Sequence, residues 1–160
     1  MKKKILTVVV VLVLAMAVIG VVIHKNGQDE KGGISFISES EQIELSLDKL
    51  TITDFSGTLV NGKGETFEHD FSGILLRDAL ENNGFVVEET SEVTVTSADN
   101  YSATITGDEI LNDDKVYIAT ACDGEKVEGI DEGTNGAELV VFGDKNSKRC
   151  VRYLMEVEVK

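Results

Sequence analysis

The chain has 160 residues and a formal net charge of −14 at pH 7. This length suits one domain with attachments and is too short for two ordinary domains. The acidity argues against a nucleic-acid-binding function, which needs a basic face, and against close adhesion to an anionic membrane surface.

The N-terminal segment has the composition of a membrane anchor. Residues 5–23, ILTVVVVLVLAMAVIGVVI, carry no charge, and 19 residues in helical form span about 28 Å, which matches a bilayer core. Ala15-Met16-Ala17 is a possible cleavage site and leaves a cleavable signal peptide as the alternative. Lysines at 2–4 favour a cytoplasmic N-terminus, so the rest of the chain is expected outside the cytoplasm. The predicted organisation is a stub (1–4), a single-pass transmembrane anchor (5–23), a flexible tether (24–33) and one domain (34–160).

The first half of the domain mixes strand and helix patterns. QIELSLDKL, residues 42–50, alternates apolar and polar residues and predicts a half-buried strand that enters a turn or short helix. Residues 55–73 predict a hairpin with a tight turn at NGKG. GILLRDALENNG, residues 73–84, has apolar residues at helical spacing, and Asn83-Gly84 is a C-terminal cap signal.

The second half of the domain is richer in strands. Residues 91–106 predict two strands around the turn SADN, which Asp99 shapes, and 107–113 predict one helical turn with Asp108 as its cap. Strands are then predicted within three further segments, 115–127, 138–142 and 149–160. In the first of these segments, side chains that alternate strictly between the two faces of a strand would place Val116, Ile118, Thr120 and Cys122 on one face. This order predicts an α+β domain with a mixed or antiparallel β-rich sheet, closer to a barrel or sandwich than to a parallel α/β fold.

Basic residues gather near the C-terminus. Of the ten basic residues beyond residue 33, four lie in DKNSKRCVRY, residues 144–153. Guanidinium groups fork two donors onto one oxyanion, so Arg149 and Arg152 predict the edge of a site for a small anionic ligand. The alternative is a cationic segment that offsets nearby carboxylates.

Two cysteines are present, Cys122 and Cys150. Outside the cytoplasm they are candidates for a disulfide that closes a loop of about 28 residues. The alternatives are two buried thiols, or a reactive Cys150 whose pKa is lowered by its basic neighbours. With His24 and His69 they match no known metal-binding pattern, so no metal site is predicted.

Six segments, in this order, resemble the oxidoreductase molybdopterin-binding domain, the central fold of the sulfite oxidase family. They are GILLRDALENNG (73–84), SADNY (97–101), EILNDD (109–114), ACDGE (121–125), GAELVVFG (136–143) and RCVRY (149–153). The resemblance covers about residues 43–160 and implies the sulfite-oxidase-type fold with a molybdopterin cofactor. It implies that the cofactor-binding residues include Arg149, Arg152, Tyr101 and Asn61.

The chain departs from this family at three positions. Asn61 stands near the expected place of the cysteine that binds molybdenum, and asparagine cannot supply a thiolate. Glu138 replaces an arginine, where a carboxylate would repel a pyrophosphate, and Phe142 replaces a proline. No catalytic residue is therefore predicted. The sequence favours a membrane-anchored, non-catalytic module that binds a ligand or an envelope protein. An active molybdopterin-dependent oxidoreductase subunit and a structural envelope interaction module are the alternatives.

Overall fold

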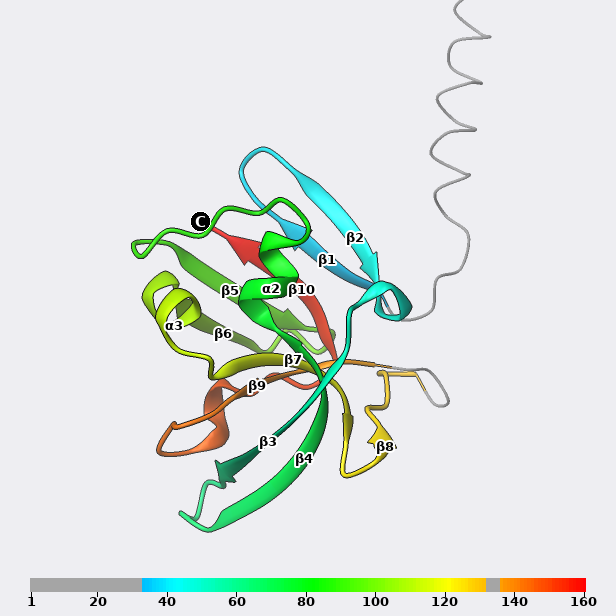
Figure 1. The fold of residues 1–160 in the computed structure, drawn as a ribbon, viewed down its shortest axis with the longest axis vertical. Coiled ribbons are helices and arrows are strands. Elements are labelled where there is room, and N and C mark those ends of the chain that lie inside the picture. The colour runs from blue at the N-terminus through cyan, green and yellow to red at the C-terminus, as the bar shows by residue number, and fades with distance from the viewer. Residues whose placement is uncertain (1–32, 132–135) are drawn as a thin grey trace, which may run out of the picture. The chain divides into compact units, whose positions relative to one another are not determined.

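The computed structural model describes residues 33–131 and 136–160 (Figure 1). The predicted anchor at 5–23 and the stub at 1–4 lie outside the described residues. Within the described ranges, no helix is long and apolar enough to cross a membrane.

One five-stranded sheet, called the first sheet, has the strand order β2-β1-β10-β5-β6. Strands β1 and β10 run parallel, whereas the other neighbours are antiparallel, so the sheet is mixed as predicted. Strand β1 was not predicted as a strand. The bounds are Gly33–Ile37 (β1), Gln42–Ser46 (β2), Glu92–Ser97 (β5), Ser102–Thr106 (β6) and Leu154–Val159 (β10).

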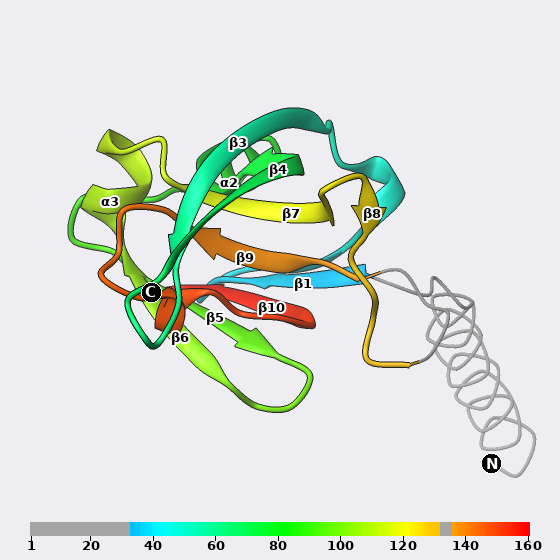
Figure 2. The ribbon, with the colours of Figure 1, turned by 90° about the horizontal axis from the view of Figure 1, so that it is seen from below.

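The second sheet is antiparallel, with the order β3-β4-β7-β8 and with β9 also paired to β7. Figure 2 shows β3, β4 and β7 on one side of the described domain and β10, β5 and β6 on the other. The bounds are Thr53–Val60 (β3), Thr66–Leu75 (β4), Val116–Cys122 (β7), Glu125–Lys126 (β8) and Glu138–Val141 (β9).

Short helices connect the strands. Helix α2 contacts β4 and β7, and helix α3 contacts β6. The helical segments are α2 (Leu76–Glu81), α3 (Gly107–Asn112) and the 3-10 turns η1 (Leu47–Lys49) and η2 (Ser147–Arg149).

Apolar side chains from both sheets and from α2 form the main core, with Phe36, Leu76 and Ile118 among those fully buried. The burial of this surface is the main favourable contribution to folding. A second, smaller cluster lies on the other face of the second sheet. Its buried members are Phe71, Ala119 and Val140, and its half-buried members are Phe55, Leu59, Cys122 and Phe142.

Strand β7 contains a β-bulge that is not evident from the sequence pattern. Gly73 of β4 pairs with Ala119, whereas Ser72 pairs with Ala121, so Thr120 is an extra residue in β7. The Thr120 hydroxyl donates to the carbonyl oxygen of Ser72 at 3.2 Å.

The bulge reverses the face on which Cys122 lies. Period two predicts Cys122 on the face of Val116 and Ile118, and those two residues do lie in the main core. Cys122 instead packs with the smaller cluster around Phe71. The prediction for Cys122 is therefore wrong, because the extra residue shifts the alternation by one position.

Other boundaries also differ from the predictions. Residues 73–75 belong to β4, so helix α2 begins only at Leu76. Its predicted C-terminal cap is confirmed, because Asn83 donates to the carbonyl oxygen of Ala79 at 2.8 Å and Gly84 has a φ of 84°.

The N-cap of α3 is Thr106 and not Asp108. Thr106 and Glu109 form a reciprocal capping box, which satisfies two otherwise unpaired backbone donors. The last strand begins at Leu154 and not near 149. Residues before it form the turn η2, and Tyr153 has a φ of 52° that a strand does not accommodate.

Candidate ligand and metal site

The turn between β7 and β8 positions the first functional group. Asp123 and Gly124 have φ values of 52° and 81°, and Cys122 pairs directly with Glu125. Asp-Gly is favoured in such two-residue hairpin loops, because both central residues need positive φ. The segment ACDGE, residues 121–125, therefore holds a two-residue hairpin turn.

The carboxylate of Asp123 turns back onto strand β4. One oxygen accepts the backbone N–H of Asp70 at 3.0 Å, and the other lies 2.7 Å from Nδ1 of His69. The His69 hydrogen bond is the main reason why the pKa of Asp123 is lowered. Two hydrogen bonds to separate β4 residues therefore fix the orientation of this carboxylate.

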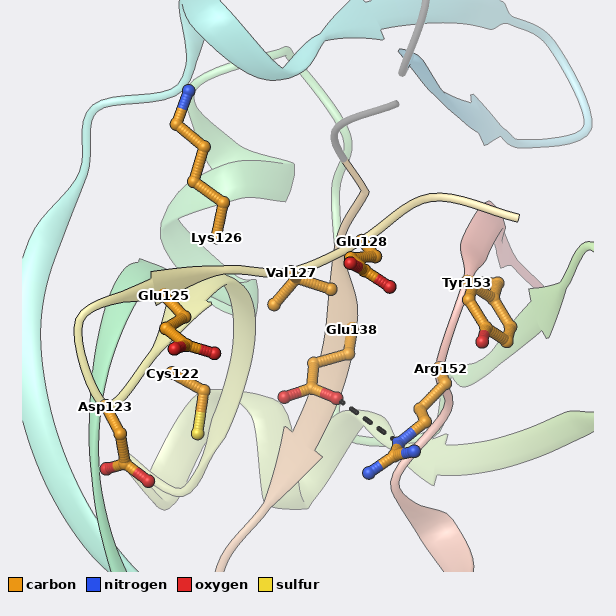
Figure 3. A pocket seen from close by; sticks show the side chains of 9 residues that line it. All are labelled: Cys122, Asp123, Glu125, Lys126, Val127, Glu128, Glu138, Arg152 and Tyr153. Atoms are coloured by element: carbon orange, nitrogen blue, oxygen red, sulfur yellow. Dashed lines mark ion pairs between the residues drawn. The ribbon is translucent and has the colours of Figure 1, made fainter. Parts of the chain in front are cut away.

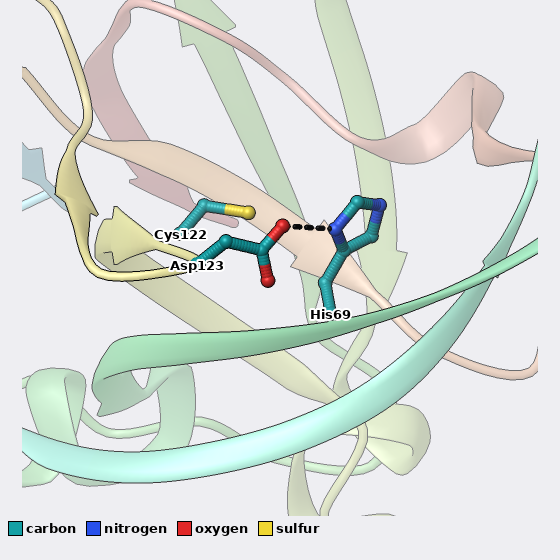
Figure 4. A group of neighbouring side chains, drawn as sticks. All are labelled: His69, Cys122 and Asp123. Carbon is teal, nitrogen blue, oxygen red and sulfur yellow. Dashed lines mark hydrogen bonds and ion pairs between the residues drawn. The ribbon is translucent and has the colours of Figure 1, made fainter.

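His69, Cys122 and Asp123 form one cluster, here called the triad (Figure 4). One nitrogen, sulfur or oxygen atom from each side chain lies within 4.8 Å of the others. Burial, followed by the charges of Asp123 and Glu138, raises the pKa of Cys122 to about 11. The thiol of Cys122 is therefore protonated at neutral pH.

Two adjoining cavities open beside the triad and share Cys122, Glu138 and Arg152 as lining residues. The first has a volume of about 380 Å³ and is also lined by Asn61, Phe67, His69, Phe71 and Cys150. The second, of about 360 Å³, is also lined by Asp123, Glu125, Lys126, Glu128 and Tyr153 (Figure 3). These volumes are in the range of small-molecule sites.

Glu138 gives the shared wall of the two cavities a half-buried carboxyl group. Its side chain is only 17% exposed, and burial is the main reason why its pKa is raised. The nearest cation, Nε of Arg152, lies 3.9 Å away on a side chain that is 82% exposed (Figure 3). The second cavity is lined by four carboxyl groups and two basic side chains. The surroundings are therefore net negative.

We expect Glu138→Gln to raise the melting temperature at pH 7 by roughly 2–5 °C. The folded pKa lies above the ordinary value of 4.5, so the folded state binds this proton more tightly than the unfolded state. The contribution of Glu138 to the free energy of unfolding is therefore fully present at low pH. It is lost as the pH rises from 4.5 through the pKa of Glu138 in the folded state. The difference between variant and wild type should disappear at about pH 4 and below. Thermal melts at both pH values test this, and an equal difference at both would contradict it.

Four residues were expected to bind a cofactor, and two of them line the cavities. Arg152 borders both cavities and Asn61 borders the first. The Asn61 side chain, however, closes its own turn. Its Oδ1 accepts the backbone N–H groups of Lys63 and Glu65 at 2.8 and 3.0 Å, and its Nδ2 donates to the Glu65 carboxylate at 2.6 Å.

Arg149 does not line either of these two cavities. Its guanidinium donates to Asp144 at 2.7 Å and to Glu109 at 2.8 Å. Burial would raise the pKa of Glu109, but hydrogen bonds from Arg149 and Thr106 outweigh burial and lower it. Arg149 therefore joins the first turn of α3 to the 144–149 segment.

Tyr101 also lies outside the lining of both cavities. Its side chain is 47% exposed, and its hydroxyl donates to the carbonyl oxygen of Lys148. The neighbouring Asp99 has the predicted turn-forming role, because its carboxylate accepts the Ser97 hydroxyl and the Tyr101 backbone N–H. The Ser97 hydrogen bond is the main reason why the pKa of Asp99 is lowered.

The two cysteines are free thiols, so the predicted disulfide is not formed in this structure. Strand β9 lies between them, because Leu139 pairs with Ile118 of β7 on one side and with Val151 on the other. Two strand spacings separate the backbones by about 10 Å. A disulfide needs Cα atoms within about 7 Å.

The thiol of Cys150 is not activated by its basic neighbours. Burial is the main cause that raises its pKa, and the charges of Glu138 and Asp144 add to this effect. The backbone N–H of Val141 donates to its sulfur at 3.5 Å and partly opposes the shift. The guanidinium of Arg149 faces Asp144 and Glu109 instead.

The sequence pattern does not place His69 at a site. His69 and Asp123 are 54 residues apart and meet only through the pairing of β4 with β7. The available signal was the Asp-Gly turn, whose acid lies against β4.

The fold and site define a β-rich α+β domain with an acidic cavity. Neither a protein-family model nor a curated protein matches the chain. Among solved structures, the sulfane dehydrogenase SoxCD from Paracoccus pantotrophus matches with a TM-score of 0.64 at 12% identity. The match covers 82% of this chain and only 39% of that chain. It supports a distant likeness to a sulfite-oxidase-type fold and does not extend to function.

Proposed function

We propose that this chain is a membrane-anchored, extracytoplasmic binding module that uses a sulfite-oxidase-type fold without molybdenum catalysis. Glu138 is the observation that carries the proposal. Its carboxyl group is largely buried and lines both cavities at a position where the family resemblance calls for an arginine. A negative group there disfavours the pyrophosphate of a molybdopterin.

Asn61 and Arg149 support the same conclusion. Asn61 stands near the place that the family resemblance gives to the thiolate ligand, and its side-chain oxygen and nitrogen are both engaged within the β3–β4 turn. Arg149, expected at the cofactor phosphate, is held by Asp144 and Glu109. If Arg149 bound a phosphate instead, the carboxylates of Asp144 and Glu109 would lose their hydrogen-bond donor, which costs free energy. The side chains around the cavity do not suit a molybdopterin.

The ligand that fits the cavities is small and carries no negative charge. Each cavity has room for a small molecule, and Phe67 and Phe71 supply an apolar wall in the first. The excess of carboxyl groups in the second cavity disfavours the small anion expected from the sequence. The apolar run at 5–23 would hold this binding domain outside the membrane through the tether at 24–33.

Pterin analysis tests the proposal. The full chain is purified in mild detergent from its native host grown with ample molybdate, then denatured and oxidised, and pterin fluorescence is measured. A molybdopterin enzyme is processed in parallel as the positive control. The expected result is no pterin signal above the buffer. One equivalent of pterin per chain would contradict the proposal and restore the alternative of an active oxidoreductase subunit.

A further inference from the structure

We propose that His69, Cys122 and Asp123 bind one divalent transition-metal ion of the zinc class, with an open coordination position toward the cavity. The inference rests on the proposed function, because it names a ligand for the same cavity. The observation behind it is the convergence of an imidazole, a thiol and a carboxylate from β4, β7 and the β7–β8 turn (Figure 4).

The donor set selects the kind of metal. Thiolate and imidazole are ligands for zinc and related transition metals, whereas calcium and magnesium require several oxygen ligands. The triad offers a single carboxylate. Three protein ligands with a fourth, open position are typical of zinc sites that also bind a small molecule.

The geometry of the triad requires only a small adjustment to hold an ion. Around tetrahedral zinc, with bonds of about 2.0–2.3 Å, ligand atoms lie roughly 3.3–3.8 Å apart. The triad atoms lie within 4.8 Å, and Nδ1 of His69 is 2.7 Å from the Asp123 carboxylate. The His69 and Asp123 side chains are 31% and 55% exposed, so both have room to shift. The ion would replace the thiol proton and the proton shared by His69 and Asp123.

The neighbours of the triad limit how far its side chains can move. The backbone N–H of Asp70 binds the second carboxylate oxygen of Asp123, as outer-shell donors do at metal sites. The His69 ring lies between Phe67 and Phe71, with ring centroids 6.4 and 5.8 Å away. Two ligands sit on paired strands, which position side chains more accurately than loops do.

The surrounding charge favours a cation. Cys122 and Glu138 line the same two cavities, and the charge of Glu138 reaches the thiol. Arg152, the basic side chain that lines both cavities, is 82% exposed and can move into solvent. A divalent ion would therefore reduce the charge imbalance around the cavity.

Metal titration of the full chain in mild detergent tests the site. Calorimetry with zinc chloride is expected to show one equivalent bound, and magnesium chloride is expected to show no binding. Cobalt substitution should give a thiolate-to-cobalt charge-transfer band together with the visible bands of a four-coordinate ion. We expect Cys122→Ser to abolish the charge-transfer band. Cys122→Ser and His69→Gln should each weaken zinc binding at least about 10–100-fold.

Two further variants locate the binding. Glu68→Gln removes an exposed carboxylate next to His69 on β4 and should keep the wild-type zinc affinity. Cys150→Ser should keep the charge-transfer band, because the other thiol provides it. Failure of the wild type to bind zinc, or loss of the band in Cys150→Ser but not in Cys122→Ser, would overturn the inference. Thermal melts show that each variant is folded. If the purified chain binds no zinc and contains no pterin, only this inference is overturned. If it contains pterin, the proposed function is overturned.

Discussion

Replacing Gly73 by alanine is expected to lower the free energy of unfolding by about 3 kcal/mol or more. A Cβ at this position would lie 2.1 Å from the carbonyl oxygen of Ile118 and 2.8 Å from Cα of Ala119. Both are backbone atoms of β7 and cannot rotate away, so β4 and β7 would have to separate. Because this pairing brings His69 to Cys122, the variant should also lose zinc binding. Denaturant unfolding followed by circular dichroism measures the loss of stability.

Gly62 provides the matched control. It lies in the β3–β4 turn, and a Cβ added there meets no atom within 4 Å. Gly62→Ala should therefore change stability by less than about 0.5 kcal/mol. If Gly73→Ala were as stable as Gly62→Ala, the close pairing of β4 and β7 described above would be wrong.

Arg149→Ala is expected to lower the free energy of unfolding by about 1–3 kcal/mol. The change leaves the carboxylates of Glu109 and Asp144 without their shared donor. The side chains of Arg149, Glu109 and Asp144 are 32%, 31% and 21% exposed, so the loss should be smaller than for a fully buried ion pair. Denaturant unfolding followed by circular dichroism measures this loss of stability as well. Zinc affinity should remain unchanged, because Arg149 lies outside the lining of both cavities.

Arg152→Ala separates the structural role of Arg149 from a role at the cavity. Arg152 is 82% exposed and its ion pair with Glu138 is 3.9 Å long, so its loss should cost less than the loss of Arg149. A stable Arg149→Ala variant together with a strongly destabilised Arg152→Ala variant would reverse the assignment of the two arginines.

Local signals predicted most of the strands correctly. Alternation and the Asn-Gly turn predicted the β3–β4 hairpin, and the turn SADN predicted the β5–β6 hairpin. The face of Cys122 was not predictable in the same way. Its position depends on a bulge at Thr120, which is defined by how β7 pairs with β4 and not by the sequence of β7 alone.

The candidate site was predicted only in part. Asn61 and Arg152, expected from the family resemblance, do border the cavity. Arg149 does not, because the turn η2 directs it to Asp144 and Glu109. His69 was missed, because its partner Asp123 lies 54 residues away in the sequence.

Metal content tests the central claim most directly. The full chain, purified from molybdenum-replete native cells without chelators, is analysed for molybdenum and zinc by mass spectrometry of the same sample. The expected result is no molybdenum above the buffer background, with zinc near one equivalent per chain. Stoichiometric molybdenum would contradict the claim that this fold serves as a binding module without molybdenum catalysis.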